Sequence, residues 1–67
     1  MENKYRQYTS ADIDYEVFEK LCYDLAKESK NPNYAKECLD GAKTINEIER
    51  LYKDGYTLDE AFYLLTY

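Results

Sequence analysis

The chain has 67 residues, with 14 acidic residues against nine basic ones, a net charge of −5 and no histidine. A chain of this length forms one domain and buries only ~60% of the surface that its unfolded form exposes. It therefore lacks room for a deep enzyme cleft beside an adequate core. The net negative charge argues against a nucleic-acid binder that works by neutralising phosphates.

The balance of residue types predicts a compact, soluble, all-α domain. Hydrophobic residues make up 45% of the chain and charged residues 34%, with only two glycines and one proline, which excludes a disordered tail. No apolar run approaches the ~20 residues that span a membrane, and the segment 1–5 has no hydrophobic signal core. We expect a cytoplasmic protein that makes no membrane contact.

Cys22 and Cys38 are expected to be reduced in that compartment. Both fall on predicted inward faces of helices, where a cysteine behaves as a small apolar residue. A disulfide or a redox-sensitive thiol is the alternative. Without histidine or a second cysteine pair the two thiols cannot complete a usual structural zinc site, so no metal is expected.

The first predicted elements are an N-terminal arm over residues 1–8 and a single helical domain over residues 9–67. The arm has three charges and two tyrosines but no helical apolar period. The sequence Thr9-Ser10-Ala11-Asp12 is typical of a helix start, where side chains accept bonds from free amide groups. It predicts a long helix over about residues 10–29. The apolar residues of this helix recur every three or four positions: Ile13, Val17, Phe18, Leu21, Cys22 and Leu25.

The pair Asn31-Pro32 predicts the end of that helix and the start of a second one, because Asn is a good cap and Pro suits the first helical position. The second helix is expected over about residues 32–40, with Gly41 as its left-handed stop. Its buried edge would consist of Ala35, Cys38 and Leu39.

Two capping boxes predict the remaining helices. The sequence Thr44-Ile45-Asn46-Glu47 opens a helix over about residues 44–54 that ends before Gly55, and Thr57-Leu58-Asp59-Glu60 opens a last helix over about residues 57–66. The expected architecture is four helices joined by short loops, with no strands.

No motif in the chain predicts catalysis. Histidine, the usual acid–base group at neutral pH, is absent, and no nucleophile elbow or phosphate-binding glycine loop occurs. The alternating acids from Asp12 to Glu16 look like the opening of a calcium loop, but Val17 stands where that loop needs glycine and Tyr23 where it needs glutamate. We predict a non-enzymatic protein without metal or cofactor.

The segment from Ile48 to Leu65 resembles the first two helices of a ubiquitin-associated domain. The shorter stretch from Gly55 to Leu65 resembles the hairpin that follows the wing in mercury-resistance-type transcription regulators. A helix, a glycine, a capping box and a second helix produce both resemblances. They imply a helical hairpin here, and no functional residue is carried over.

Acidic residues concentrate near both ends of the chain, with six acids and two lysines between residues 12 and 28, and three acids and no base from residue 54 onward. The predicted partner-binding residues of the first helix share one stripe: Asp12, Glu16, Glu19 and Tyr23. Asp59 and Glu60 add a second patch. One interpretation is a solvated surface, partly balanced by pairs such as Glu16 with Lys20. The functional hypothesis is an anionic surface that competes with nucleic-acid phosphates for a basic groove.

Nine tyrosines exceed what one small core needs. Exposed tyrosine gives large contact area at low entropic cost and is enriched at interface hot spots. The alternative is that these rings cover a core too small to close over itself. The tyrosines that fall off the apolar stripes are Tyr5, Tyr8, Tyr15, Tyr23 and Tyr34.

In size, acidity and tyrosine content the chain resembles small phage-type inhibitors of host nucleic-acid machinery, such as anti-CRISPR proteins and DNA mimics. This resemblance of type implies a protein partner with a basic surface, no direct nucleic-acid contact and action in the host cytoplasm. The alternative hypothesis is a structural or adaptor module that forms a homodimer through its apolar last helix. The segment that would self-associate comprises Phe62, Tyr63, Leu64, Leu65 and Tyr67, with Phe62, Leu65 and Tyr67 as its selected contact residues.

Overall fold

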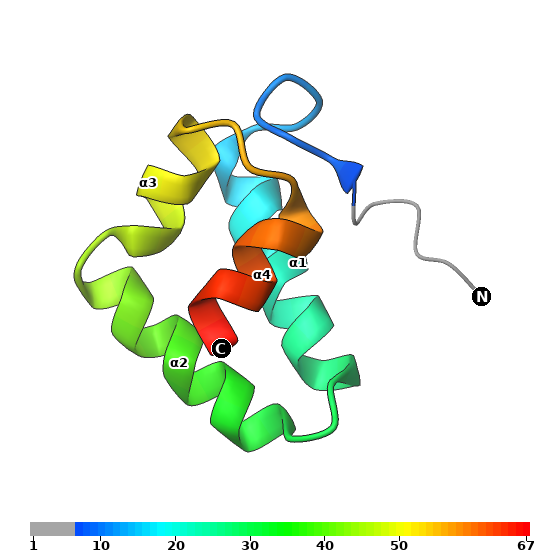
Figure 1. The fold of residues 1–67 in the computed structure, drawn as a ribbon, viewed down its shortest axis with the longest axis vertical. Coiled ribbons are helices and arrows are strands. Elements are labelled where there is room, and N and C mark those ends of the chain that lie inside the picture. The colour runs from blue at the N-terminus through cyan, green and yellow to red at the C-terminus, as the bar shows by residue number, and fades with distance from the viewer. Residues whose placement is uncertain (1–6) are drawn as a thin grey trace.

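The computed structural model describes residues 7–67, which fold into four α-helices and contain no strand. The all-α, four-helix prediction is confirmed. Figure 1 shows the helices in chain order. Their bounds are α1 Tyr15–Glu28, α2 Pro32–Thr44, α3 Glu47–Lys53 and α4 Leu58–Thr66.

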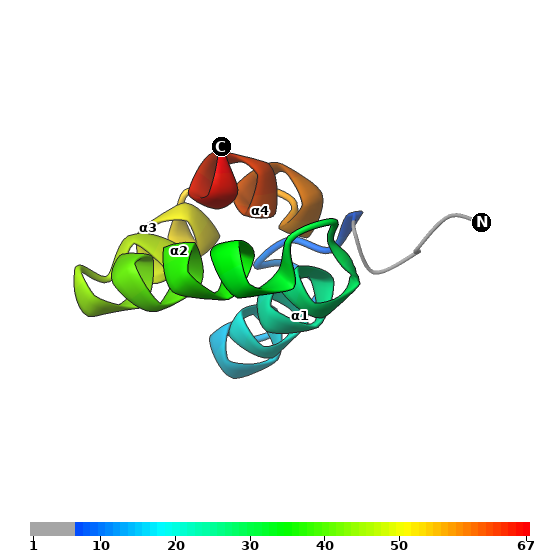
Figure 2. The same ribbon diagram turned by 90° about the horizontal axis from the view of Figure 1, so that it is seen from below.

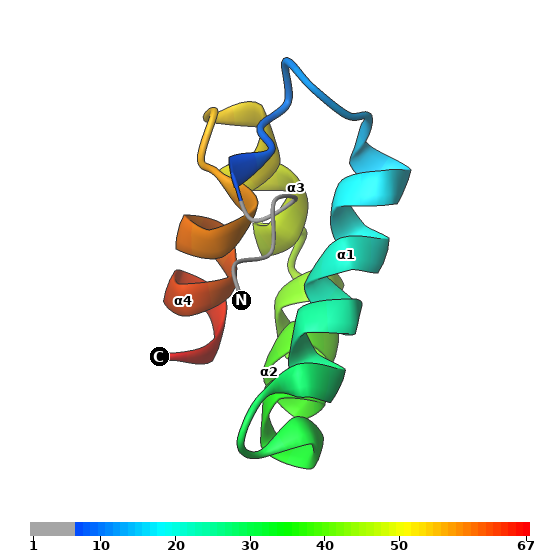
Figure 3. The ribbon, with the colours of Figure 1, turned by 90° about the vertical axis from the view of Figure 1, so that its right-hand side faces the viewer.

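The helices pack around one core, and α1 and α4 form the two outer sides of the molecule. Figures 2 and 3 show α2 between α1 and α4. The exposed surfaces of α1 and α4 therefore lie on different sides of the protein.

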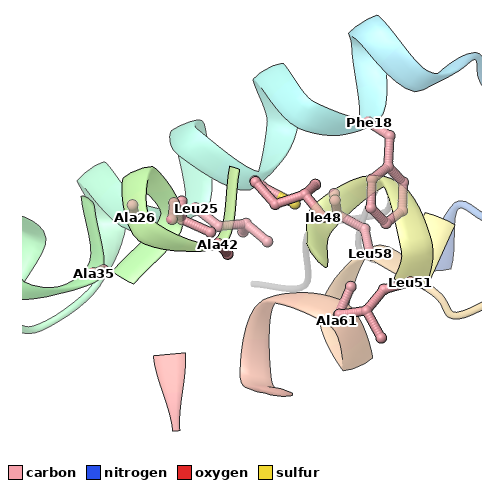
Figure 4. Close-up of a cluster of buried hydrophobic side chains, with 11 residues drawn as sticks. Phe18, Leu25, Ala26, Ala35, Ala42, Ile48, Leu51, Leu58 and Ala61 are labelled. Atoms are coloured by element: carbon pink, nitrogen blue, oxygen red, sulfur yellow. The ribbon is translucent and has the colours of Figure 1, made fainter. Parts of the chain in front are cut away.

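All four helices contribute to the core, and no polar or charged residue in the described part of the chain is fully buried. Figure 4 shows this cluster. Alanines on three of the helices allow close approach of neighbouring backbones. The buried residues are Phe18, Cys22, Leu25, Ala26, Ala35, Leu39, Ala42, Ile48, Leu51, Leu58 and Ala61.

The first helix begins later than predicted, at Tyr15 rather than near residue 10. The predicted start motif folds into a separate turn, because the Thr9 amide donates to Asp12 Oδ2 at 2.9 Å and the Asp12 amide donates to the Thr9 carbonyl at 2.9 Å. Asp14 caps the helix instead, with its Oδ1 accepting from the Val17 amide at 3.2 Å.

The prediction that α2 ends at residue 40 is wrong, since the helix continues through Gly41 to Thr44. The Thr44 hydroxyl donates to the Asp40 carbonyl at 3.0 Å, so it does not cap the next helix. The left-handed residue is Asn46, with a φ of 59°. Extension of α2 buries Ala42 in the core, which offsets the ~1 kcal/mol that a glycine costs inside a helix.

The connection between α3 and α4 agrees with the sequence prediction. Gly55 has a φ of 91°, which ends α3. The capping box of α4 is present: the Glu60 amide donates to Thr57 Oγ1, and the Thr57 amide donates to Glu60 Oε1, both at 3.2 Å.

Residues 7–14 form a strap that crosses from the start of α4 to the start of α1 (Figure 3). The Leu58 amide donates to the Tyr8 carbonyl at 2.8 Å, and the Tyr52 hydroxyl donates to the Ile13 carbonyl at 2.7 Å. The strap therefore contacts both α3 and α4. Of the predicted arm over residues 1–8, residues 1–6 lie outside the described part of the chain.

Candidate functional site

The residues of the predicted stripe fall into two groups: an exposed part, and an occupied part whose side chains contact α2. Asp12 and Glu16 are exposed. Glu19 is half-buried, and its carboxylate lies 3.5 Å from Lys43 Nζ on α2. A partner at this surface would interact mainly with the charges of Asp12 and Glu16, because Lys43 offsets the charge of Glu19.

Tyr23 belongs to the occupied part. Its hydroxyl donates to Asp40 Oδ1 on α2 at 2.6 Å, and Lys36 Nζ lies 2.9 Å from the other oxygen of that carboxylate. Burial and then the hydrogen bond to Asp40 raise the pKa of Tyr23, while the hydrogen bonds from Tyr23 and Lys36 lower the pKa of Asp40. The Tyr23 side chain therefore links α1 to α2, and its hydroxyl already has a hydrogen-bond partner within the protein.

Charge is distributed unevenly among the helices. Residues 30–54, which hold α2 and α3, have five acids and five bases. Four of those bases each lie within 3.8 Å of a carboxylate: Lys36, Lys43, Arg50 and Lys53. Residues 12–28 have six acids against two lysines, and residues 55–67 have two acids and no base. The net negative charge therefore resides on the two outer helices and on Asp12 and Asp14 just before α1.

The outer face of α4 holds the second predicted acidic patch within an open groove. Asp59 and Glu60 line this groove together with apolar side chains, and its volume is about 620 Å³. We call this surface the α4 groove. The residues that define it here are Tyr56, Asp59, Glu60, Tyr63 and Leu64.

The predicted self-association residues do not share one exposed face. Phe62 and Leu65 are half-buried and pack against the core, whereas Tyr67 is 87% exposed. The ring of Tyr67 contacts that of Tyr63, with centroids 5.2 Å apart. Tyr63 and Leu64 are 60% and 50% exposed.

The predicted self-association segment also includes Tyr63 and Leu64, and the helical period separates these two from the residues that face the core. The buried stripe of α4 runs through Leu58 and Ala61 to Phe62 and Leu65, so residues 63 and 64 fall outside it. Because the whole segment is apolar, its composition alone does not show which residues face the core and which face solvent.

The described tyrosines that were predicted to lie off the core also form two groups, one half-buried and one exposed. Tyr15 and Tyr23 are half-buried and pack against the core, and the ring of Tyr15 contacts that of Tyr52 at 5.6 Å. Tyr8 is half-buried and Tyr34 is exposed, while Tyr5 lies outside the described residues. Several rings therefore complete the small core.

The two cysteines are both free thiols, Cys22 buried and Cys38 half-buried. The prediction of a buried apolar role is thus confirmed for Cys22 and met only in part by Cys38.

No protein-family model, curated protein or solved structure matches the chain. Within residues 7–67, none of the helices combines the length and the apolar character that crossing a membrane requires.

Proposed function

We propose that the chain is a non-enzymatic cytoplasmic protein that binds a basic surface of another protein. In its most specific form it is an anti-CRISPR-type inhibitor that covers the nucleic-acid-binding surface of a host nuclease complex. The supporting observation is the uneven charge: α2 and α3 are balanced, whereas α1, the end of the strap before it and α4 carry the excess of acid.

Asp12 in the strap and Glu16 in the first turn of α1 are the residues that fit this role best. Both are exposed at the acidic end of the helix, and Glu16 takes no part in the caps and turns of the strap. Carboxylates of this kind offer a basic groove the same sign of charge that phosphates do. They speed association and act more strongly at low salt, since exposed charges are screened beyond ~10 Å at 0.1 M.

Competition for a nucleic acid tests the proposal. Labelled target DNA is bound to each member of a panel of purified CRISPR effector complexes, and the chain is titrated in while DNA release is followed by fluorescence anisotropy. We expect release from at least one complex. A panel in which every complex retains its DNA would contradict the inhibitor hypothesis.

The variant Glu16→Lys tests the surface itself. We expect its association rate with the responsive complex to fall by roughly three- to tenfold at low salt, with a smaller effect at high salt. The matched control is Glu37→Lys, which makes the same change of charge at an exposed site on the balanced helix α2. Equal losses in the two variants would show that net charge, and not the α1 surface, determines binding.

A further inference from the structure

We infer that the α4 groove is a separate docking site, which takes an apolar segment bearing arginine or lysine from a partner protein. It differs from the α1 surface in position, since the two helices form different sides of the molecule (Figure 2). It also differs in chemistry, because aromatic area accompanies the acids.

Exposed apolar area is concentrated at the end of the chain. Within residues 7–67, seven large apolar side chains are exposed. Four of the seven belong to residues 56–67: Tyr56, Tyr63, Leu64 and Tyr67. Three of these four line the groove, and the fourth contacts the ring of Tyr63. A contiguous apolar surface rimmed by polar groups marks an interaction site, whereas scattered exposed residues do not.

The side chains around this surface select its partner by charge. Asp59 and Glu60 are the charged residues that line the groove, and α4 has no lysine or arginine. Glu60 lines the groove, and its Oε1 accepts the capping-box hydrogen bond from the Thr57 amide. A carboxylate beside exposed tyrosine rings suits a guanidinium or ammonium group, through an ion pair and through cation–π contact with the ring.

The same charges disfavour a second copy of this chain. A two-fold pairing of α4 on α4 would bring acids from both copies to one interface and would supply no base from either helix. Like charges brought together at an interface disfavour that pairing. Charge complementarity therefore favours a cationic segment of another protein over self-association.

The test uses a short amphipathic peptide of leucine and lysine as the probe, and the same peptide with glutamate in place of lysine as its counterpart. Backbone amide NMR shifts of the full chain are followed during each titration. We expect saturable shifts on α4 and around Tyr56 with the lysine peptide, and none with the glutamate peptide. Shifts confined to the start of α1 would overturn this inference while leaving the proposed function in place.

Matched variants locate the contact. Tyr63→Ala should weaken binding of the lysine peptide by roughly five- to thirtyfold, as for an aromatic hot spot. Tyr34→Ala, at a similarly exposed ring on α2, should leave it unchanged. Equal binding by the two variants would overturn the inference. So would α4 shifts that depend on protein concentration without peptide, because they would identify the occupant as a second copy.

Discussion

The Cys22 thiol shows how burial changes the chemistry of a single residue in this small core. The side chain is fully buried, and burial, followed by the negative charge of Glu19, raises its pKa from about 9 to about 12. The folded state therefore holds the thiol proton more tightly than the unfolded state does. A rise in pH through the interval between these two values favours unfolding.

Replacement of Cys22 makes this effect measurable. At neutral pH, Cys22→Ala should lower the free energy of unfolding by about 1 kcal/mol, because it leaves a small cavity. This difference should shrink as the pH rises above about 9, where the wild-type chain loses the contribution of the protonated thiol. Urea unfolding of both proteins at several pH values measures it. A difference that stays constant with pH would contradict the argument.

Two glycines illustrate opposite roles at the scale of the elements. Gly41 lies inside α2, and a Cβ added there would meet no atom within 4 Å. Gly55 has a φ of 91° and ends α3. An L-residue strains the second conformation but not the first.

Alanine substitution separates these roles. We expect Gly41→Ala to raise the free energy of unfolding by about 0.5–1 kcal/mol through helix propensity. Gly55→Ala should lower it by about 1 kcal/mol through backbone strain. Thermal unfolding followed by circular dichroism measures both. A destabilised Gly41→Ala variant would show that α2 ends near residue 40 after all.

Local signals predicted some helix ends, and tertiary contacts determined the others. The Thr57–Glu60 capping box and Pro32 in the first turn of α2 act on the nearby backbone, so the sequence reveals both. The predicted cap by Asn31 is wrong, because its side chain makes no capping hydrogen bond. The end of α2 depends on burial of Ala42 against the other helices, which no local pattern records. The start of α1 was misplaced because Thr9 and Asp12 form a turn that resembles a helix start.

At the scale of the whole molecule, long-range contacts decide which of the predicted site residues remain available. Glu19 pairs with Lys43, and Tyr23 bonds Asp40, across the α1–α2 interface. The sequence placed these acids and tyrosines on one helix stripe but could not show which of them α2 would engage. Asp12 and Glu16 stay exposed, because α2 lies beside the later turns of α1 and not beside its start (Figure 3).

The Tyr52 hydroxyl offers a test of how strongly the strap is held to the helices. It donates to the Ile13 carbonyl at 2.7 Å while its ring contacts Phe18 at 5.1 Å. Tyr52→Phe keeps the ring and removes the hydrogen bond, so it should cost about 0.5–1.5 kcal/mol of stability.

Tyr67→Phe, at a ring that is 87% exposed, is the control for that variant and should change stability by less than about 0.5 kcal/mol. Chemical denaturation measures both variants, and amide hydrogen exchange of residues 8–14 shows whether the strap opens more often. An unchanged exchange rate in Tyr52→Phe would exclude the hydroxyl as the tie between strap and α3.

The long-range contacts of the strap lead us to expect that it docks late in folding. Tyr52 lies 39 residues beyond Ile13, and the strap can make its contacts only after the later helices have assembled. Closure of so long a loop is slower than formation of a helix from neighbouring residues. The segment that comes first in the sequence is thus expected to dock last. Early in folding, the start of α4 lacks its bond to Tyr8.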